Sequence, residues 1–257
     1  MLFRSDSEFE APASKVLEKA ITDCRLQKTD WHVLIRFLAL QDARTPAKMI
    51  GFIQQWETRY GELFQRTIEQ SVDRIEALTS CDRQEYDQKS PLADFLPLRI
   101  TTKIEPDQEY GCLEAKILVG RALWLHQIKH ILCRTADVLL EHHWTIMKAP
   151  DGIEWFTTDD PVMRLNFYDR KNYNFNGGWK SEGTEIFMPL GPRHLLYTQV
   201  GSRPPKRGAQ FSLDQANIIQ RCIAQHSYRY IFASSPREEV LTYKPRIVNA
   251  EIGRAHV

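Results

Sequence analysis

Apolar residues in the first part of the chain recur at the three- and four-residue spacing of amphipathic helices. One such stripe runs from Val16 to Cys24. After it, Thr29-Asp30 offers an N-cap for a second helix, from Trp31 to about Gln41. These patterns predict two helices near the N-terminus.

A helix boundary is predicted at Arg44-Thr45-Pro46, because threonine caps free N–H groups and proline suits the first helical position. From there a continuous apolar stripe, Met49 to Ile75, predicts a helix of about eight turns. A looser segment with prolines follows, and a second long helix is expected from about Gln108 to His143.

The pattern changes at Trp144, where short runs rich in β-branched and aromatic residues are separated by Gly, Pro, Asn and Asp. The runs that predict strands are Trp144–Lys148, Ile153–Thr157, Val162–Phe167, Thr184–Met188, His194–Val200 and Tyr230–Ala233. Ser212 and Gln215 match a capping box, which opens a predicted helix over residues 212–227.

Helices followed by strands indicate an α+β fold, in which N-terminal long antiparallel helices pack against a C-terminal antiparallel sheet with one further helix. The helical part covers residues 1–143 and the β-rich part residues 144–250, and we expect one compact domain. Residues 251–257 read like a translated sequencing adaptor, so the chain is expected to be a fragment whose natural sequence was cut near Ala250.

Composition is that of a soluble globular protein, with 42% hydrophobic and 26% charged residues. Lys and Arg number 34 and Asp and Glu 33, so the formal net charge of +1 does not indicate nucleic acid or a membrane surface as a partner. The five cysteines form no Cys-x-x-Cys pair, and the N-terminus lacks the apolar core of a signal peptide. No apolar run reaches the roughly 20 residues of a membrane helix. We therefore expect a cytoplasmic protein whose partners are unknown.

Three segments, in this order, resemble a known family. They are Phe37-Leu38-Ala39-Leu40-Gln41 with Arg44-Thr45-Pro46, then Trp155-Phe156-Thr157-Thr158-Asp159-Asp160-Pro161-Val162, then Phe187-Met188-Pro189-Leu190-Gly191-Pro192. Their order and spacing are similar to the domain of unknown function 4238 family, over roughly residues 25–235. The resemblance implies a mainly prokaryotic, uncharacterised protein and supplies no reaction.

Asp159 and Asp160, with Thr158 before them, are the candidate catalytic residues. Adjacent carboxylates at a turn can point into one site, and together with nearby acidic residues they would form an oxygen ligand set for Mg²⁺ or Mn²⁺. In the alternative hypothesis, this segment is a turn that ends a strand, and its side chains bond backbone N–H groups.

His126 and His130 are the candidate metal ligands, because residues at i and i+4 share one face of a helix and two imidazoles can chelate a zinc ion. Cys133 and Asp137 extend the same stripe. The alternative is the polar flank of an amphipathic helix. A divalent metal is the candidate cofactor.

Pro106-Asp107 with Glu114-Ala115-Lys116 matches the PD-(D/E)xK nuclease pattern. That mechanism places its metal-binding carboxylates on adjacent strands. Glu114 and Lys116 fall within the second predicted long helix and would point about 200° apart, so the pattern is set aside.

The chain contains no P-loop, G-x-G-x-x-G or G-x-S-x-G motif. The first hypothesis is therefore a binding or regulatory module. The alternative is a metal-dependent hydrolase, with nucleic acid as one candidate substrate, that uses Asp159 and Asp160. It requires one of these aspartates to face a cleft that contains His126, His130 or His142, and it fails if backbone N–H groups bind the carboxylates.

Overall fold

The protein is described by a computed structural model, in which residues 10–51, 65–66, 69, 98–104, 111–117, 128 and 134–243 are described. The chain divides into two compact units. The first unit combines Met1–Pro46 with Ile131–Val257, and the second is Ala47–His130. This division differs from the boundary between residues 143 and 144 at which the sequence pattern changes.

Two helices open the first unit, α1 (Ala11–Ile21) and α2 (Lys28–Ala43). The predicted N-cap at Thr29-Asp30 is wrong, because the N-cap of α2 is Gln27. Asp30 lies one turn inside the helix, where its carboxylate accepts the Gln27 backbone N–H at 2.9 Å. An acidic side chain at this position also complements the positive end of the helix dipole. Lys19 of α1 lies 3.0 Å from the same carboxylate and ties the two helices together.

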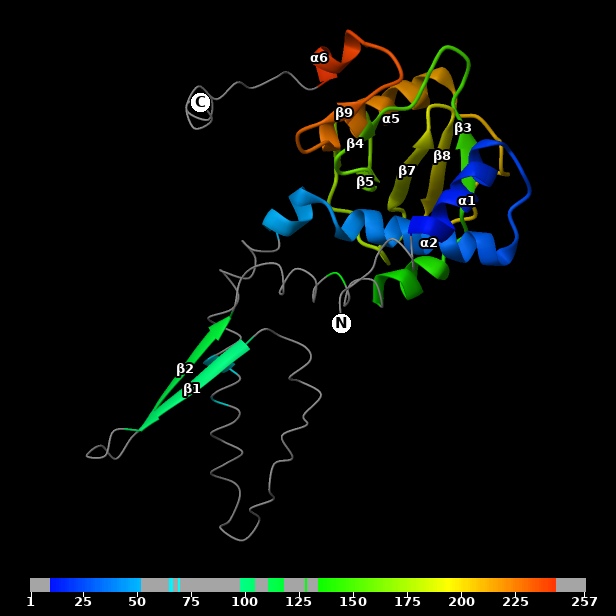
Figure 1. Cartoon of the computed structure of the whole chain (residues 1–257). Coiled ribbons are helices and arrows are strands. Elements are labelled where there is room, and N and C mark those ends of the chain that lie inside the picture. Colours follow the sequence, from blue (N-terminus) through cyan, green and yellow to red (C-terminus); the bar gives the residue numbers. More distant parts are fainter. Residues whose placement is uncertain are drawn as a thin grey trace. The chain divides into compact units, whose positions relative to one another are not determined.

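A five-stranded antiparallel sheet forms the centre of the first unit (Figure 1). The strands stand in the order β3 (Thr145–Lys148), β8 (His194–Gln199), β7 (Glu185–Gly191), β5 (Met163–Phe167) and β6 (Tyr173–Asn174). The predicted strands at 144–148, 162–167, 184–188 and 194–200 are thereby confirmed. The α+β fold expected from the sequence is confirmed as well.

The predicted strand Ile153–Thr157 is wrong over most of its length, because only Thr157–Thr158 form a strand, β4. This strand pairs with β9 (Ile231–Phe232) in a separate two-stranded sheet. The two residues before this strand, Trp155 and Phe156, form hydrogen bonds with other parts of the chain. The Trp155 N–H donates to the Pro192 carbonyl at 2.8 Å, and the Phe156 N–H donates to the Gln220 side chain.

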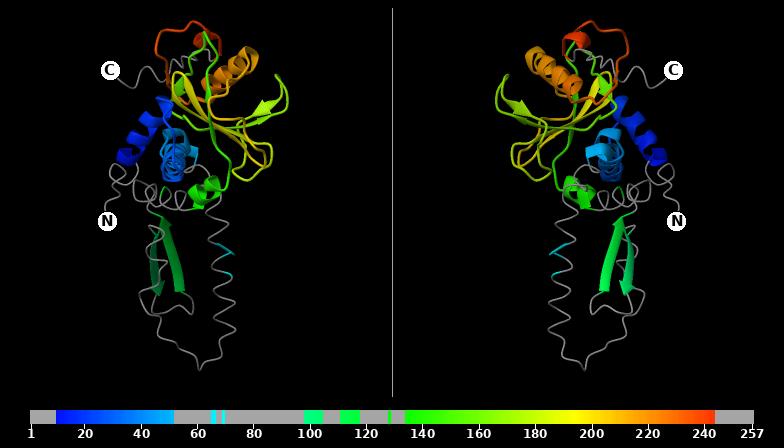
Figure 2. Two further views of the ribbon diagram at one scale, coloured as in Figure 1. Left: turned by 90° about the vertical axis from the view of Figure 1, so that its right-hand side faces the viewer. Right: turned by 90° about the vertical axis from the view of Figure 1, so that its left-hand side faces the viewer.

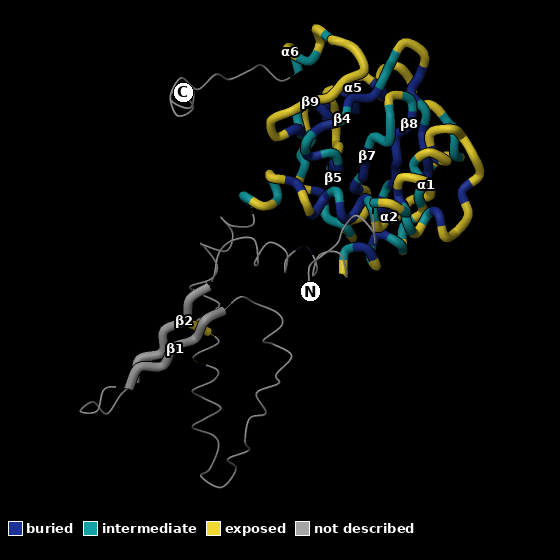
Figure 3. The backbone as a smooth tube through the Cα atoms, viewed as in Figure 1, coloured by how far each residue is buried: buried dark blue, intermediate teal, exposed yellow. Residues whose placement is uncertain are grey.

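Helices cover both faces of the central sheet (Figure 2). Helix α5 (Leu213–His226) packs on one face, and α1 and α2 lie on the other. The α5 face carries a core cluster to which β5, β7 and β8 contribute Met163, Leu165, Phe187, Leu195 and Tyr197. Buried residues are concentrated along these strands (Figure 3). The predicted capping box is present, since Ser212 and Gln215 exchange hydrogen bonds at the start of α5. A short helix, α6 (Glu239–Tyr243), follows β9.

The second unit contains an antiparallel strand pair, β1 (Leu98–Ile104) and β2 (Gly111–Ile117), with Leu98 opposite Ile117. The predicted helix from Gln108 to His143 is therefore wrong at its start. In the sequence Leu113, Ala115 and Ile117 alternate with polar residues, a two-residue period that fits a strand. Residues 128 and 134–140 are helical, as predicted, but the helix ends at Leu140 and not at His143.

The helix predicted to start at Pro46 is also described only in part. Residues 46–51, 65, 66 and 69 are helical, as expected. The remainder lies outside the described residues, as do His126, His130 and the tail at 251–257. Within the described parts of the chain, no helix is both long enough and apolar enough to span a membrane.

Candidate functional site, a pocket shared by three sequence segments

Three segments of the sequence, at 37–46, 155–162 and 187–192, carry the resemblance to a known family. In the first unit, residues from all three line a single pocket of about 490 Å³. We call it the motif pocket. Its lining residues are Leu17, Phe37, Gln41, Arg44, Trp155, Thr157, Thr158, Pro161, Met188, Pro189, Leu190, Gly191, Pro192, Phe232, Ala233 and Ser234. The pocket therefore joins parts of the chain that are far apart in the sequence.

Helix α2 contributes one face to the motif pocket. Phe37, Gln41 and Arg44 stand at i, i+4 and i+7 and therefore share a side of the helix. The residues between them, Leu38 to Leu40, are buried against the rest of the unit. The first segment thus supplies both an anchor to the core and a wall of the pocket.

The second and third segments are bonded to each other beside the pocket. The Trp155 N–H donates to the Pro192 carbonyl, and the guanidinium of Arg193, the residue after the third segment, donates to the carbonyl oxygens of Pro150 and Ile153, just before the second, at 3.1 and 3.0 Å. The part of β7 that lines the pocket contains a register shift between Pro189 and Gly191. These contacts connect two walls of the pocket.

The chemistry of the motif pocket is mainly apolar. Aromatic, aliphatic and proline side chains form most of the lining, and Gln41, Thr157, Thr158 and Ser234 add neutral polar groups. Among the described residues that line the pocket, Arg44 carries a charge and the others are uncharged. None of these lining residues is an Asp, Glu, His or Cys, so the lining itself offers no general base, thiol or metal-binding carboxylate.

Asp159 is part of the second segment but does not line the pocket. Its two carboxylate oxygens accept the backbone N–H groups of Tyr228 and Arg229 at 3.0 and 2.8 Å. Its own N–H donates to the Tyr230 carbonyl. The Asp159 carboxylate thus binds backbone N–H groups, which is the arrangement that the turn hypothesis requires.

Asp160 is buried and lies beside His226, at the end of α5. The His226 Nδ1–H donates to the Asp160 carbonyl oxygen at 3.1 Å, and Nε2 lies 3.8 Å from Oδ2. Thr158 closes the same turn, since its hydroxyl donates to the Asp160 carbonyl at 2.8 Å and accepts the Asp160 N–H at 3.2 Å. Sequence reasoning missed His226, although its position in the last turn of a predicted helix was a usable signal.

The other histidines do not join this turn within the described residues. His142 Nε2 donates to the Trp179 carbonyl at 2.7 Å and lines a separate depression with Lys180 and Arg203. The candidate ligands His126 and His130 lie outside the described residues. Among the residues that are described, no group of three or more His, Cys, Asp or Glu side chains is placed to hold a metal ion.

The nuclease-like pattern lies partly on a strand of the second unit. Glu114 and Lys116 lie on strand β2 and not in a helix, so the helical ground for setting the pattern aside was wrong. On the neighbouring strand, however, Thr101 stands opposite Glu114 and Arg99 opposite Lys116. The position facing Glu114 is thus not acidic, and Asp107 lies outside the described residues.

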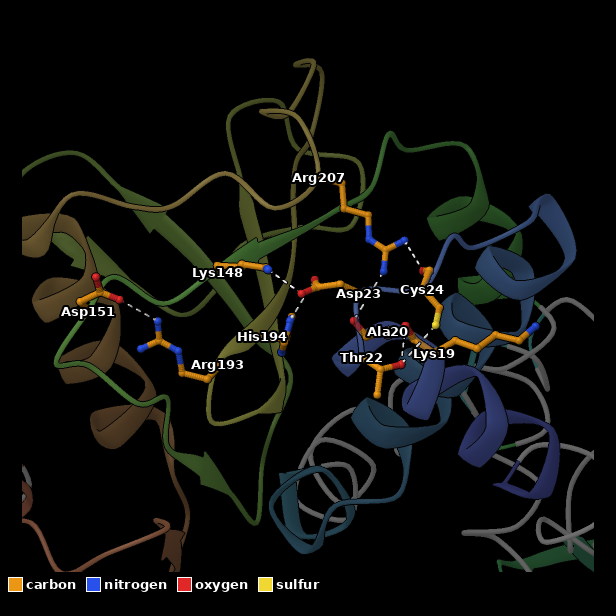
Figure 4. Close-up of polar contacts among 10 residues, drawn as sticks. All are labelled: Lys19, Ala20, Thr22, Asp23, Cys24, Lys148, Asp151, Arg193, His194 and Arg207. Carbon is orange, nitrogen blue, oxygen red and sulfur yellow. Dashed lines mark hydrogen bonds and ion pairs between the residues drawn. The ribbon is translucent and has the colours of Figure 1, made fainter.

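A polar cluster fastens the loop between α1 and α2 to the sheet (Figure 4). Asp23 binds Lys148 of β3 and lies 3.2 Å from His194 Nε2 of β8. The hydrogen bond from Lys148 and the neighbouring His194 hold the pKa of the Asp23 carboxyl below its ordinary value. Arg207 donates to the Cys24 carbonyl at 2.7 Å. The basic loop at 201–208 therefore makes a structural contact with the loop between α1 and α2.

The family comparison agrees with the three segments. The family described as "Protein of unknown function (DUF4238)" matches residues 5–237, and the chain belongs to it. No curated protein and no solved structure matches the chain. The family description names no reaction, ligand or partner, so a function has to be argued from the geometry.

Proposed function

We propose that this member of the DUF4238 family is a binding module whose motif pocket receives a small organic molecule with an apolar body. The observation that carries the proposal is the meeting of three separate segments around one pocket. A volume of about 490 Å³ falls within the range of small-molecule sites, about 300–1,000 Å³. Such sites combine a mainly apolar lining with a few polar groups that fix orientation, as this pocket does.

Contacts within the chain hold the walls of the pocket together. The Trp155–Pro192 hydrogen bond joins the second segment to the third, and Arg193, directly after the third segment, binds the carbonyl oxygens of Pro150 and Ile153, just before the second. The Asp23–Lys148 contact secures the loop that leads into α2. A preformed site loses less conformational entropy on binding, which favours affinity.

The metal-dependent hydrolase alternative has less support. It needs carboxylates directed into a cleft, whereas the Asp159 oxygens accept two backbone N–H groups and neither Asp159 nor Asp160 lines the motif pocket. A binding function uses the apolar lining that is present, and it requires no acid or base among the lining residues.

The proposal is tested with 2-naphthamide, an uncharged bicyclic probe. At about 0.3 kcal/mol per non-hydrogen atom, its 13 such atoms give a Kd of about 1 mM, which ligand-observed NMR measures readily. The substitution Gln41→Trp fills space at the wall formed by α2 and should weaken binding at least about tenfold. His32→Trp places the same side chain at an exposed position of α2 that does not line the pocket, and should bind like the wild type.

Both variants are first checked for unchanged circular dichroism and thermal midpoint. Absence of binding to the wild type would count against the proposal. Equal binding by a folded Gln41→Trp variant would show that the probe sits elsewhere, and would also overturn the assignment of the motif pocket.

A further inference from the structure

Arg44 occupies a defined place at the edge of the motif pocket. It is the C-cap residue of α2, and its backbone N–H donates to the Leu40 carbonyl at 3.1 Å. A cation at this end of a helix is favoured by the helix dipole. Arg44 is also one of the residues that line the pocket, so its side chain stands where an occupant of the pocket can meet it.

The current partner of Arg44 is a carboxylate of the same chain. Arg44 Nη1 binds Glu10 Oε1, and 34 positions separate the two residues in the sequence. Glu10 is the N-cap residue of α1, yet its side chain makes no capping hydrogen bond to that helix. Both side chains are partly exposed, 42% for Arg44 and 33% for Glu10, so the pair is accessible to a competing anion.

We infer that the ligand of the motif pocket is a small carboxylic acid, whose carboxylate takes the place of Glu10 on Arg44 while its apolar body fills the pocket. This inference rests on the proposed function. A planar guanidinium suits a carboxylate, which accepts two parallel N–H bonds. A phosphate group carries more charge and is usually held by several cations or N–H groups. Among the described lining residues Arg44 has no second cation beside it.

Glu10 then acts as a built-in competitor. Every carboxylate ligand has to displace it, so the observed affinity is lower than the affinity for a free Arg44. By the same linkage, a bound ligand releases the Glu10 side chain from the end of α2. The N-cap residue of α1 thereby senses whether the pocket is occupied.

The test compares two probes of nearly equal shape, 2-naphthoate and the uncharged 2-naphthamide, on the full chain. Glu10→Gln should strengthen binding of 2-naphthoate about fivefold and leave 2-naphthamide unchanged, since exposed ion pairs are worth about this much. Arg44→Gln should remove the preference for 2-naphthoate. Glu18→Gln, which removes the same charge from an exposed position of α1 away from the pocket, should change neither probe.

The outcomes separate this inference from the proposed function. If neither probe binds the wild type, the binding function itself fails. If 2-naphthamide binds in a manner sensitive to Gln41→Trp, but Glu10→Gln leaves 2-naphthoate unchanged, the pocket stands and the carboxylate inference is overturned. An equal gain for both probes in Glu10→Gln would likewise overturn it, because it would reflect a wider opening and not competition for charge.

Discussion

The backbone N–H of Arg229 donates to Oδ2 of Asp159 across 2.8 Å and links two positions that are 70 residues apart in the sequence. The neighbouring oxygen accepts the Tyr228 N–H at 3.0 Å. The loop after α5 is therefore held against the end of β4, next to the point where β9 begins. The Asp159 carboxylate therefore helps to position β9, and β9 supplies Phe232 to the lining of the pocket.

We expect Asp159→Ala to lower the free energy of unfolding by about 1 kcal/mol, because two backbone N–H groups lose a charged acceptor at a site that water can reach. Urea denaturation of the purified variant gives the measurement. Asp151→Ala is the matched control, since that side chain is fully exposed and forms an ion pair with Arg193 at 3.2 Å. Equal midpoints for Asp159→Ala and the wild type would contradict a structural role for Asp159.

A pH-dependent effect is expected at Glu185. Burial raises the pKa of the Glu185 carboxyl above its ordinary value, and the hydrogen bond from the Tyr197 hydroxyl, 2.9 Å long, offsets part of this shift. The folded protein therefore holds this proton more tightly than the unfolded chain does. The resulting stability is fully present below the unfolded pKa, about 4.3, and is lost as the pH rises through the folded pKa.

Glu185→Gln removes the ionisation and keeps an acceptor for Tyr197. Its stability relative to the wild type should therefore increase from about pH 4 towards neutral pH. Unfolding midpoints in urea across this range provide the measurement, with Glu182→Gln as the exposed control three residues earlier, in the loop before β7. A difference from the wild type that stays constant with pH would argue against a buried, ionising Glu185.

Asp23 combines an unusual backbone conformation with the polar cluster. Its φ angle is 59°, in the left-handed region that asparagine and aspartate tolerate better than alanine. Asp23→Asn keeps this tolerance and removes the charge that binds Lys148, whereas Asp23→Ala loses both. We expect Asp23→Ala to be less stable than Asp23→Asn by about 1 kcal/mol in thermal or urea unfolding. The reverse order would show that backbone strain at this residue is unimportant.

Several elements of the fold follow from local pattern. The strands β3, β5, β7 and β8 stand where runs of β-branched and aromatic residues are separated by turn residues, and α5 begins at its capping box. These features depend on residues close in sequence, so a pattern of a few positions suffices. The segment 111–117 was misread because helix and strand periods compete in a short run, and the alternation of Leu113, Ala115 and Ile117 is the better description.

Other relationships depend on residues that the sequence keeps apart. The end of the predicted strand 153–157 bonds to Pro192 and Gln220, and Thr157 pairs with Phe232. No local pattern encodes these partners. The same is true of the candidate catalytic pair, because the partners of Asp159 and Asp160 come from the region around His226 to Tyr230.

Short-range periodicity and motif order are local properties, so they were enough to predict the fold class, the family and the three segments that mark it. The sequence even contained the i, i+4, i+7 spacing that puts Phe37, Gln41 and Arg44 on one side of α2. That these segments meet at one pocket, and that Arg44 binds Glu10, could be seen in the folded chain but not in the sequence. The physical reason is that such contacts are fixed by the packing of helices and strands around a common core, which places distant residues within hydrogen-bonding range.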